Sequence, residues 1–385
     1  MNDAFAIRAP RLFDGEGWHD DSALVLRDGL VERIVAARDL PVGIETVAAD
    51  GMLVPGFVDL QVNGGGGVML NDRQDVEAIR TICAAHAPFG TTALLPTLIT
   101  DTPAVTRAAV DAGAEALRLN VPGFLGLHLE GPHLSIARKG AHDPSLIRPM
   151  DDAAEADLIA AHEKVPVLLT TVAPESVDPA RIERLASAGI VVSLGHSDTG
   201  FRQARACAEA GASMATHLFN AMSQINNREP GLVGAVLDTG QLFAGLIADG
   251  VHVNPATIGI AVRAKNGPGR IFLVTDAMAT IGTDMTSFTL NGRTITRSNG
   301  RLTLDDGTLA GADLDMISAV RFMHETIGVD LTEALRMASL YPAQAMNVAH
   351  SHGRFAKGAR ADIVQLSEGL DVRSVWIAGG EVFRT

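Results

Sequence analysis

From residue 55 onward, short apolar runs alternate with longer segments of helical period. The short runs are almost continuously apolar, which is typical of parallel strands buried on both faces. The stretches between them, such as 76–87 and 105–119, are rich in alanine and space their apolar positions as a helix does. Eight runs are predicted to be strands: Gly56–Val62, Thr92–Pro96, Gly123–Leu129, Val167–Val172, Ile190–Leu194, Met214–His217, Phe243–Ala248 and Ile271–Asp276. Repeated β-then-α units predict a parallel sheet, and eight units are the number that closes a (β/α)8 TIM-type barrel.

The two ends of the chain have a different pattern. Up to about residue 54, apolar and polar positions alternate in short pieces separated by turn pairs such as Asp28-Gly29, which is typical of hairpins. Short strand-like runs and turns return at the C-terminal end. We therefore predict an α/β fold with two domains: a small β-sandwich built from residues 1–54 and 355–385, and the barrel from residues 55–354.

The segment after the eighth predicted strand carries three turn pairs, at 291–292, 299–300 and 306–307, between β-type runs. This pattern predicts an additional hairpin near the mouth of the barrel. The sequence leaves open whether this hairpin closes over a substrate. Two helical segments, 314–327 and 331–346, are expected to follow it.

Composition narrows the class of protein. The 385 residues are 47% hydrophobic, which suits a globular chain, and the net charge of −14 disfavours binding to nucleic acid or an anionic membrane. No apolar run approaches the ~20 residues that span a bilayer, and the start of the chain lacks the pattern of a secretion signal. The cysteines, Cys83 and Cys207, lie in alanine-rich segments that favour free buried thiols. We expect a soluble, cytoplasmic protein.

Four residues whose side chains can bind a metal ion or transfer a proton stand at the ends of predicted strands: Glu130, His196, His217 and Asp276. In a barrel of this kind the carboxyl ends of the strands converge on one point. Glu130 and the two histidines would hold a divalent cation and leave one position open for water, whose pKa the cation lowers. Asp276 would then accept the proton from that water. Either histidine alone could be structural, but the four together favour a metal-dependent hydrolase.

A series of motifs runs along the chain. In order they are PGFVD (55–59), HLEGP (128–132), KGAH (139–142), GHS (195–197), THLFNAM (216–222), REPG (228–231), DGVH (249–252) and TDA (275–277). In this order and over nearly the whole chain, they resemble the N-acetylglucosamine-6-phosphate deacetylases of the amidohydrolase superfamily. The resemblance implies hydrolysis of the acetamide of N-acetyl-D-glucosamine 6-phosphate to D-glucosamine 6-phosphate and acetate, in amino-sugar catabolism and recycling.

The resemblance also implies roles for individual residues. Asp276 would act first as general base and then as general acid. His142 would donate a hydrogen bond to the acetyl carbonyl, although its loop-type surroundings alone suggest a solvated histidine.

Four further positions match those that hold the sugar phosphate in the family: Asn220, the backbone of Ala221, Arg228 and His252. Without the motif around it, Arg228 would be taken as a partner in a surface ion pair. In the family the site takes residues from a neighbouring subunit, so a homodimer that shares its phosphate site across subunits is expected.

The chain departs from the wider superfamily at two strands. Many amidohydrolases end the first strand with two histidines and carry a metal-bridging lysine at the fourth, whereas this chain has Gln61-Val62-Asn63 and Thr170-Thr171-Val172. Neutral amides are poorer zinc ligands than imidazole. We therefore predict one divalent metal ion per subunit, Zn²⁺ first, with Fe²⁺, Mn²⁺ and Co²⁺ also compatible.

Other functions remain open on the sequence. N-acetylgalactosamine 6-phosphate differs from the gluco sugar at a single axial hydroxyl. An N-acyl amino acid or cyclic amide hydrolase on the same scaffold would leave Arg228 and His252 without a phosphate. A degenerate barrel that serves only as an oligomeric scaffold is the non-enzymatic alternative, and the intact Glu130 and Asp276 argue against it.

Overall fold

The computed structural model describes residues 4–385, so residues 1–3 of the predicted terminal domain lie outside the described part. A sheet of eight parallel strands forms the barrel, in the order β15-β14-β13-β12-β11-β10-β9-β6. Its strands are β6 (Phe57–Val62), β9 (Thr91–Ile99), β10 (Leu127–Glu130), β11 (Leu168–Val172), β12 (Val191–Leu194), β13 (Met214–Ala215), β14 (Phe243–Leu246) and β15 (Ile271–Leu273). All eight predicted strands are confirmed, several of them shorter than predicted. The barrel closes beyond β15, where the Asp276 amide donates to the Gln61 carbonyl at 2.9 Å.

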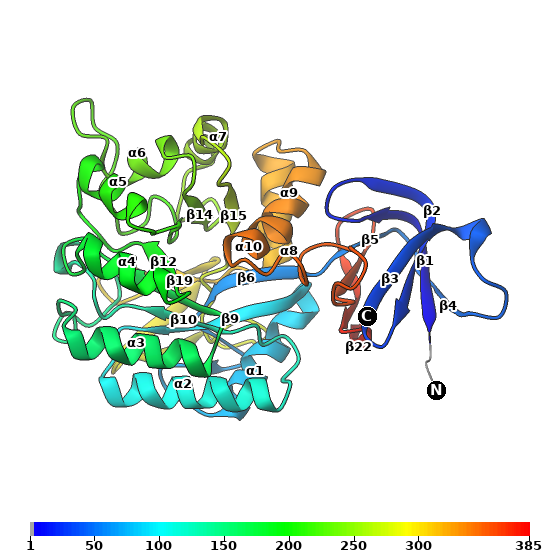
Figure 1. Ribbon diagram of the computed structural model, residues 1–385, viewed down its shortest axis with the longest axis horizontal. Helices are drawn as coiled ribbons and strands as arrows, with labels where there is room; N and C mark the ends of the chain where they lie inside the picture. The colour runs from blue at the N-terminus through cyan, green and yellow to red at the C-terminus, as the bar shows by residue number, and fades with distance from the viewer. Residues whose placement is uncertain (1–3) are drawn as a thin grey trace.

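Helices cover the outside of the barrel (Figure 1). They are α1 (Val76–His86), α2 (Pro103–Arg118), α3 (Asp152–Lys164), α4 (Pro179–Ser187), α5 (Phe201–Glu209), α6 (Gly231–Asp238), α7 (Pro255–Ala264), α8 (Met316–Arg321), α9 (Leu331–Ala338) and α10 (Leu340–Ala345), with single turns at Ala37–Asp39, Ala87–Phe89 and Ile136–Arg138. Side chains such as Asp75 and Asp178 cap the helix starts by accepting from free backbone N–H groups. Among residues 4–385, no helix has both the length and the apolar character needed to cross a membrane.

The two helical segments predicted after the barrel are more broken than their apolar spacing indicates. The segment 331–346 forms two helices, because Pro342 lacks an N–H for the carbonyl of Ala338 and its ring would clash there. Ser339, at the break, has non-helical backbone angles of φ −129° and ψ −72°. The segment 314–327 continues from α8 into one π-helical stretch, Phe322–Thr326.

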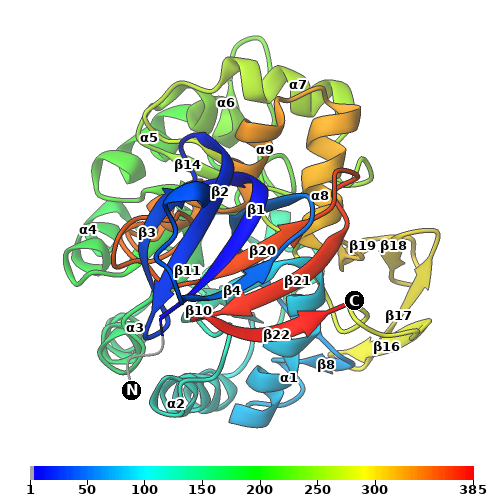
Figure 2. The ribbon, with the colours of Figure 1, turned by 90° about the vertical axis from the view of Figure 1, so that its right-hand side faces the viewer.

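The two chain ends build one eight-stranded sheet beside the barrel. Its strands are β1 (Phe5–Phe13), β2 (Trp18–Arg27), β3 (Leu30–Ala36), β4 (Glu45–Ala48), β5 (Met52–Pro55), β20 (Ile363–Leu366), β21 (Val372–Ile377) and β22 (Gly380–Arg384). Strand β5 pairs with β1 on one side and β20 on the other, which joins N-terminal and C-terminal strands (Figure 2). Leu24 and Leu53 share a buried core with Ile363 and Trp376, so the halves of the sheet enclose apolar side chains as a sandwich does.

A separate antiparallel sheet stands at the barrel mouth, and we call it the mouth sheet. It comprises β16 (Ser287–Leu290), β17 (Arg293–Ser298), β18 (Arg301–Thr303) and β19 (Leu309–Ala312), so it is larger than the predicted hairpin. Phe288, Ile295 and Leu302 form part of its own apolar core. A short hairpin, β7 (Gly64–Gly65) and β8 (Val68–Met69), follows β6 at the same mouth.

Candidate metal-dependent active site

Three side chains from three strand ends meet at the mouth of the barrel. Glu130 is the last residue of β10, and His196 and His217 each lie two residues beyond β12 and β13. Glu130 Oε1 is 3.2 Å from the Nε2 atom of each histidine, and the two Nε2 atoms are 3.0 Å apart. Ligands about 2.0–2.1 Å from a tetrahedral cation lie roughly 3.3 Å from one another. The spacing and the chemistry of these three atoms therefore fit a divalent cation of the zinc type.

Hydrogen bonding around the histidines supports this fit. His196 Nδ1 lies 2.8 Å from the Arg138 carbonyl, which can only accept, so Nδ1 carries the hydrogen and Nε2 keeps its lone pair. Burial opposes charge on Glu130, yet its hydrogen bonds with His196 and His217 lower its pKa well below the usual value. Burial likewise opposes charge on His217, and its contact with Glu130 raises its pKa. The site thus favours positive charge at the point where the three side chains meet.

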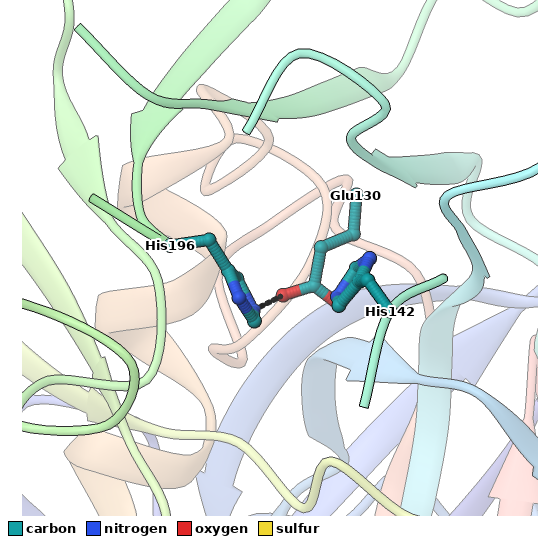
Figure 3. A group of neighbouring side chains, drawn as sticks. All are labelled: Glu130, His142 and His196. Carbon is teal, nitrogen blue, oxygen red and sulfur yellow. Dashed lines mark ion pairs between the residues drawn. The ribbon is translucent and has the colours of Figure 1, made fainter. Parts of the chain in front are cut away.

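His142 lies against this group and offers another set of donor atoms. One atom each from Glu130, His142 and His196 lie within 4.8 Å of one another (Figure 3). However, the Thr100 backbone N–H donates to His142 Nδ1 at 3.3 Å, so this nitrogen is an acceptor. The Thr100 hydroxyl, 2.7 Å away, then donates to it as well, and the ring hydrogen resides on Nε2. Burial and the neighbouring His196 hold the pKa of His142 well below its usual range, so the ring is neutral. A protonated Nε2 is a hydrogen-bond donor, which makes His142 better suited to a carbonyl oxygen than to a cation.

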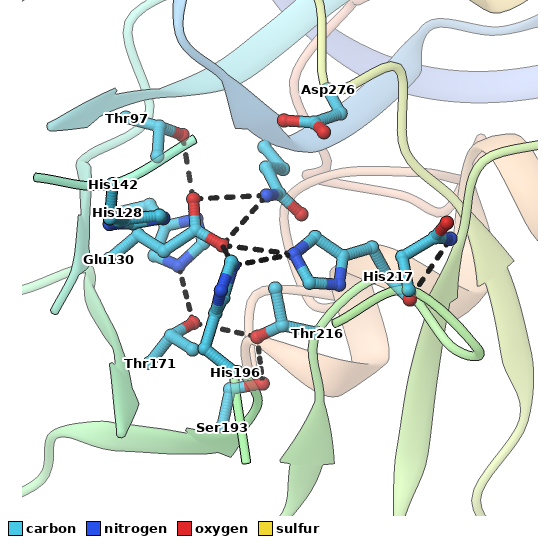
Figure 4. Close-up of polar contacts among 12 residues, drawn as sticks. Thr97, His128, Glu130, His142, Thr171, Ser193, His196, Thr216, His217 and Asp276 are labelled. Carbon is cyan, nitrogen blue, oxygen red and sulfur yellow. Dashed lines mark hydrogen bonds and ion pairs between the residues drawn. The ribbon is translucent and has the colours of Figure 1, made fainter. Parts of the chain in front are cut away.

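Asp276 faces the same group from the end of β15 (Figure 4). Burial and the charge of Glu130 raise its pKa to about 6. Asn63 Nδ2 donates to Asp276 Oδ1 at 2.7 Å, and Thr275, the preceding residue, donates through Oγ1 to the buried Asp59 at 2.5 Å. A carboxyl group with a pKa near neutrality can both accept and return a proton.

Three polar residues at the two strands where the chain departs from the wider superfamily have definite partners. Gln61 Nε2 donates to both carboxylate oxygens of Glu130, at 3.1 and 3.2 Å, and Asn63 donates to Asp276 as described. Thr171 Oγ1 lies 2.7 Å from His128 Nε2 in a polar network below the site (Figure 4). Two amides therefore point hydrogens rather than lone pairs at the acidic groups. Their position at the end of the first strand was the signal in the sequence, but it did not reveal these partners.

A cavity of about 270 Å³ opens over these side chains, and eight of the nine predicted site residues line it. They are Glu130, His142, His196, His217, Asn220, Ala221, His252 and Asp276. His252 is held by Asp249, whose Oδ2 lies 2.6 Å from His252 Nδ1. Arg228 does not line the cavity and is exposed to solvent. A second cavity, of about 290 Å³, opens between α2 and α3, and none of these eight residues lines it.

Comparison with known proteins agrees with this geometry. The model of the amidohydrolase family matches residues 52–382. An N-acetylgalactosamine-6-phosphate deacetylase of Shewanella sp. (strain ANA-3) is 44% identical over 329 residues, which cover 86% of this chain and 82% of that protein. An N-acetylglucosamine-6-phosphate deacetylase of Haemophilus influenzae is 36% identical over 363 residues, which cover 93% of this chain and 94% of that one.

Solved structures show the same relationship. The crystal structure of N-acetylglucosamine-6-phosphate deacetylase from Pasteurella multocida matches with a TM-score of 0.94 at 33% identity, covering 99% of this chain and 100% of the other. The corresponding enzyme from Thermotoga maritima matches with a TM-score of 0.87 at 27% identity, covering 99% and 100%. The chain therefore belongs to the amidohydrolase family and is a hydrolase of the deacetylase group within it.

Proposed function

We propose that this enzyme hydrolyses the acetamide of N-acetyl-D-glucosamine 6-phosphate to D-glucosamine 6-phosphate and acetate. One observation carries the proposal: the cavity brings together a cation-binding triangle, a carboxyl group with a raised pKa and a neutral imidazole donor. These are the parts that amide hydrolysis requires. N-acetyl-D-galactosamine 6-phosphate is the second candidate, because the Shewanella relative at 44% identity bears that name.

Glu130, His196 and His217 would hold one divalent cation, Zn²⁺ first. When bound, the cation supplies the Lewis acidity that activates water and polarises the amide carbonyl. Asp276 accepts the proton as the water oxygen adds to the acetyl carbon, and it returns that proton to nitrogen as the C–N bond breaks. His142 donates its Nε2 hydrogen to the carbonyl oxygen, where negative charge develops. Asn63 holds the Asp276 carboxylate in place throughout.

The phosphate group would lie toward Asn220, Ala221 and His252, which line the cavity. Arg228 has the charge and fork geometry to bind a phosphate, but it is exposed and does not line the cavity of its own chain. We propose that it reaches the phosphate in a neighbouring subunit of a homodimer. Ile225, in the same loop, is 55% exposed, and such an apolar side chain is suited to burial in a subunit contact.

The decisive experiment measures acetate release by the natively purified enzyme. The substrates are N-acetylglucosamine 6-phosphate, its galacto counterpart and unphosphorylated N-acetylglucosamine, with metal content determined on the same sample. Turnover restricted to the phosphorylated gluco sugar would support the proposal. Preference for the galacto sugar would replace the substrate but keep the reaction, and no turnover of any of the three with metal bound would refute a sugar-phosphate deacetylase.

Replacing Arg228 by alanine is expected chiefly to raise KM for the phosphorylated sugar, because the ground state and the transition state carry the same phosphate. The unphosphorylated sugar should be affected little. Arg263→Ala, at an exposed position in α7, is the matched control. Equal losses on both sugars would indicate a folding defect instead of a lost phosphate contact.

Removal of the Asn63 amide is expected to shift the pH profile. Asp276 must be ionised to accept a proton, so activity is lost as the pH falls through its pKa. The Asn63 hydrogen bond favours the ionised form and lowers that pKa. In Asn63→Leu the acidic limb of kcat/KM should therefore move to higher pH, while the exposed control Asn266→Leu keeps the wild-type profile. An unmoved limb in Asn63→Leu would exclude Asp276 as the group that titrates there.

A further inference from the structure

The mouth sheet is hydrogen-bonded to the two segments that carry Asp276, the proposed proton acceptor, and His142, the proposed hydrogen-bond donor. At its last strand, the Ala312 amide donates to the carbonyl oxygen of Asp276 at 2.9 Å. At its first turn, Arg293 donates through Nη2 to the carbonyl oxygen of Ala141, the residue before His142. A sheet appended to the barrel thus contacts the Asp276 turn through its edge strand β19 and the His142 loop through the start of its inner strand β17.

The mouth sheet also forms part of the substrate cavity. Leu290, at the end of β16, lines the cavity together with Thr308 and Leu309. Ala141 packs against the apolar core of the sheet. The loop that ends in His142 is therefore covered by the same sheet that covers the cavity.

On its other side the His142 loop packs closely against the barrel, where the Thr100 N–H donates to His142 Nδ1 and His196 Nδ1 donates to the Arg138 carbonyl. Gly140 has a φ of +54°, and a Cβ at this position would lie 3.3 Å from His196 Cε1. The loop thus passes close to a proposed metal ligand, where a side chain would press on the imidazole. The loop is therefore held between the barrel and the mouth sheet, and on the side of the sheet Arg293 binds the carbonyl next to His142.

Arg293 contacts the His142 loop, whereas the other arginines of the mouth sheet, Arg297 and Arg301, do not. Arg297 bonds to Asp313 and to the Thr283 carbonyl, which attaches the sheet to the barrel. Arg301 is exposed, and among the described residues no side-chain hydrogen bond or ion pair of Arg301 is found. Arg293 also acts on Asp143, because its charge adds to the hydrogen bonds from Ser145 that lower the pKa of Asp143. Arg293 thus acts on both chain neighbours of His142, on Ala141 by a hydrogen bond and on Asp143 by its charge.

We propose that Arg293 is a positioning residue for His142 and that it links the mouth sheet to the alignment of the carbonyl donor. By holding the Ala141 carbonyl, the guanidinium fixes the loop so that the Nε2 hydrogen of His142 meets the acetyl oxygen. This inference rests on the proposed role of His142 in deacetylation. It predicts an effect on kcat more than on KM, because the developing oxyanion exists only in the transition state.

The test is a double-mutant cycle with the metal-loaded enzyme and the sugar phosphate that it deacetylates. Arg293→Met should lower kcat by about 10- to 100-fold, somewhat less than the ~10²–10³ typical of deleting an oxyanion donor outright. KM should change by less than about threefold. Arg293→Lys, which keeps a charged donor, should recover part of the loss, and the control Arg301→Met should match the wild type.

The second arm of the cycle uses His142→Asn. In that background, Arg293→Met should cost less than about threefold, because the donor it positions is gone. Substrates with an N-trifluoroacetyl group, whose carbonyl needs less polarisation, should reduce the effect of both single variants. Full loss in both backgrounds would overturn the inference, since Arg293 would then act independently of His142.

Failure of the inference can be separated from failure of the proposed function. If His142→Asn keeps wild-type activity, the proposed donor role is wrong and the inference fails with it. If His142→Asn is impaired but Arg293→Met is not, only the inference fails. Thermal unfolding is followed for each variant, and if Arg293→Met does not fold, Arg293→Gln takes its place in the cycle.

Discussion

Replacing Asp276 by asparagine is expected to lower kcat by about 10²- to 10⁴-fold, the range that positioned proton transfer contributes. The amide has nearly the same shape as the carboxyl group but cannot accept the proton of the attacking water. Because Asp276 is not among the three residues of the cation triangle, metal content and substrate affinity should stay close to those of the wild type. The measurements are kcat at saturating substrate, metal content by mass spectrometry and the Kd of the substrate.

Asp284→Asn is the matched control for this change, because Asp284 is an exposed aspartate in the segment that follows Asp276. It should leave kcat unaltered. Near-normal kcat in Asp276→Asn would show that another group takes the proton, and the mechanism would have to be abandoned. Loss of bound metal in that variant would instead make Asp276 a ligand.

Replacing His196 by alanine is expected to remove the cation and the activity together. The change deletes one of three converging donor atoms and also the hydrogen bond that orients the ring on the Arg138 carbonyl. With two protein ligands left, affinity for a divalent cation should fall by at least about 10- to 100-fold, the cost of losing even an orienting partner. Metal content is measured on natively purified protein, in parallel with acetate release.

His350→Ala, at an exposed position, controls for the general effect of losing an imidazole. It should retain the metal and the activity of the wild type. A His196→Ala protein that keeps its full metal content would exclude His196 as a ligand and would favour His142, whose donor atom also lies near Glu130.

The barrel could be predicted because parallel strands buried on both faces leave a strong local signal. Runs such as Val191–Leu194, in which only Ser193 is polar, and Ile271–Leu273 are buried throughout, and each is followed by a helix of clear period or by a polar strand end. The extent of the mouth sheet was less predictable, because its strands β16, β18 and β19 are only three or four residues long. The break between α9 and α10 depends on Pro342, whose effect outweighs the continuous apolar period around it.

The proposed ligand set followed from the same logic, since Glu130, His196 and His217 lie at the ends of strands and strand ends converge. The hydrogen bonds that orient the neighbouring side chains could not be derived in this way. The ring hydrogen of His142 is placed by Thr100, 42 residues earlier, and the Asp276 carboxylate by Asn63, 213 residues away. Hydrogen bonds of this kind depend on atoms brought together only by the closed barrel.

The sequence by itself thus determined the barrel, the joining of the two termini and the residues that meet at the strand ends, because burial and strand direction are encoded locally in apolar spacing. The tertiary structure alone decided which amides donate to Glu130 and Asp276, which nitrogen of His142 carries hydrogen, and that Arg293 reaches the His142 loop. It also placed Arg228 on the surface, away from the cavity of its own chain. These features depend on distances of about 3 Å between residues far apart in the chain, and hydrogen bonds lose their strength within a fraction of an ångström of that distance.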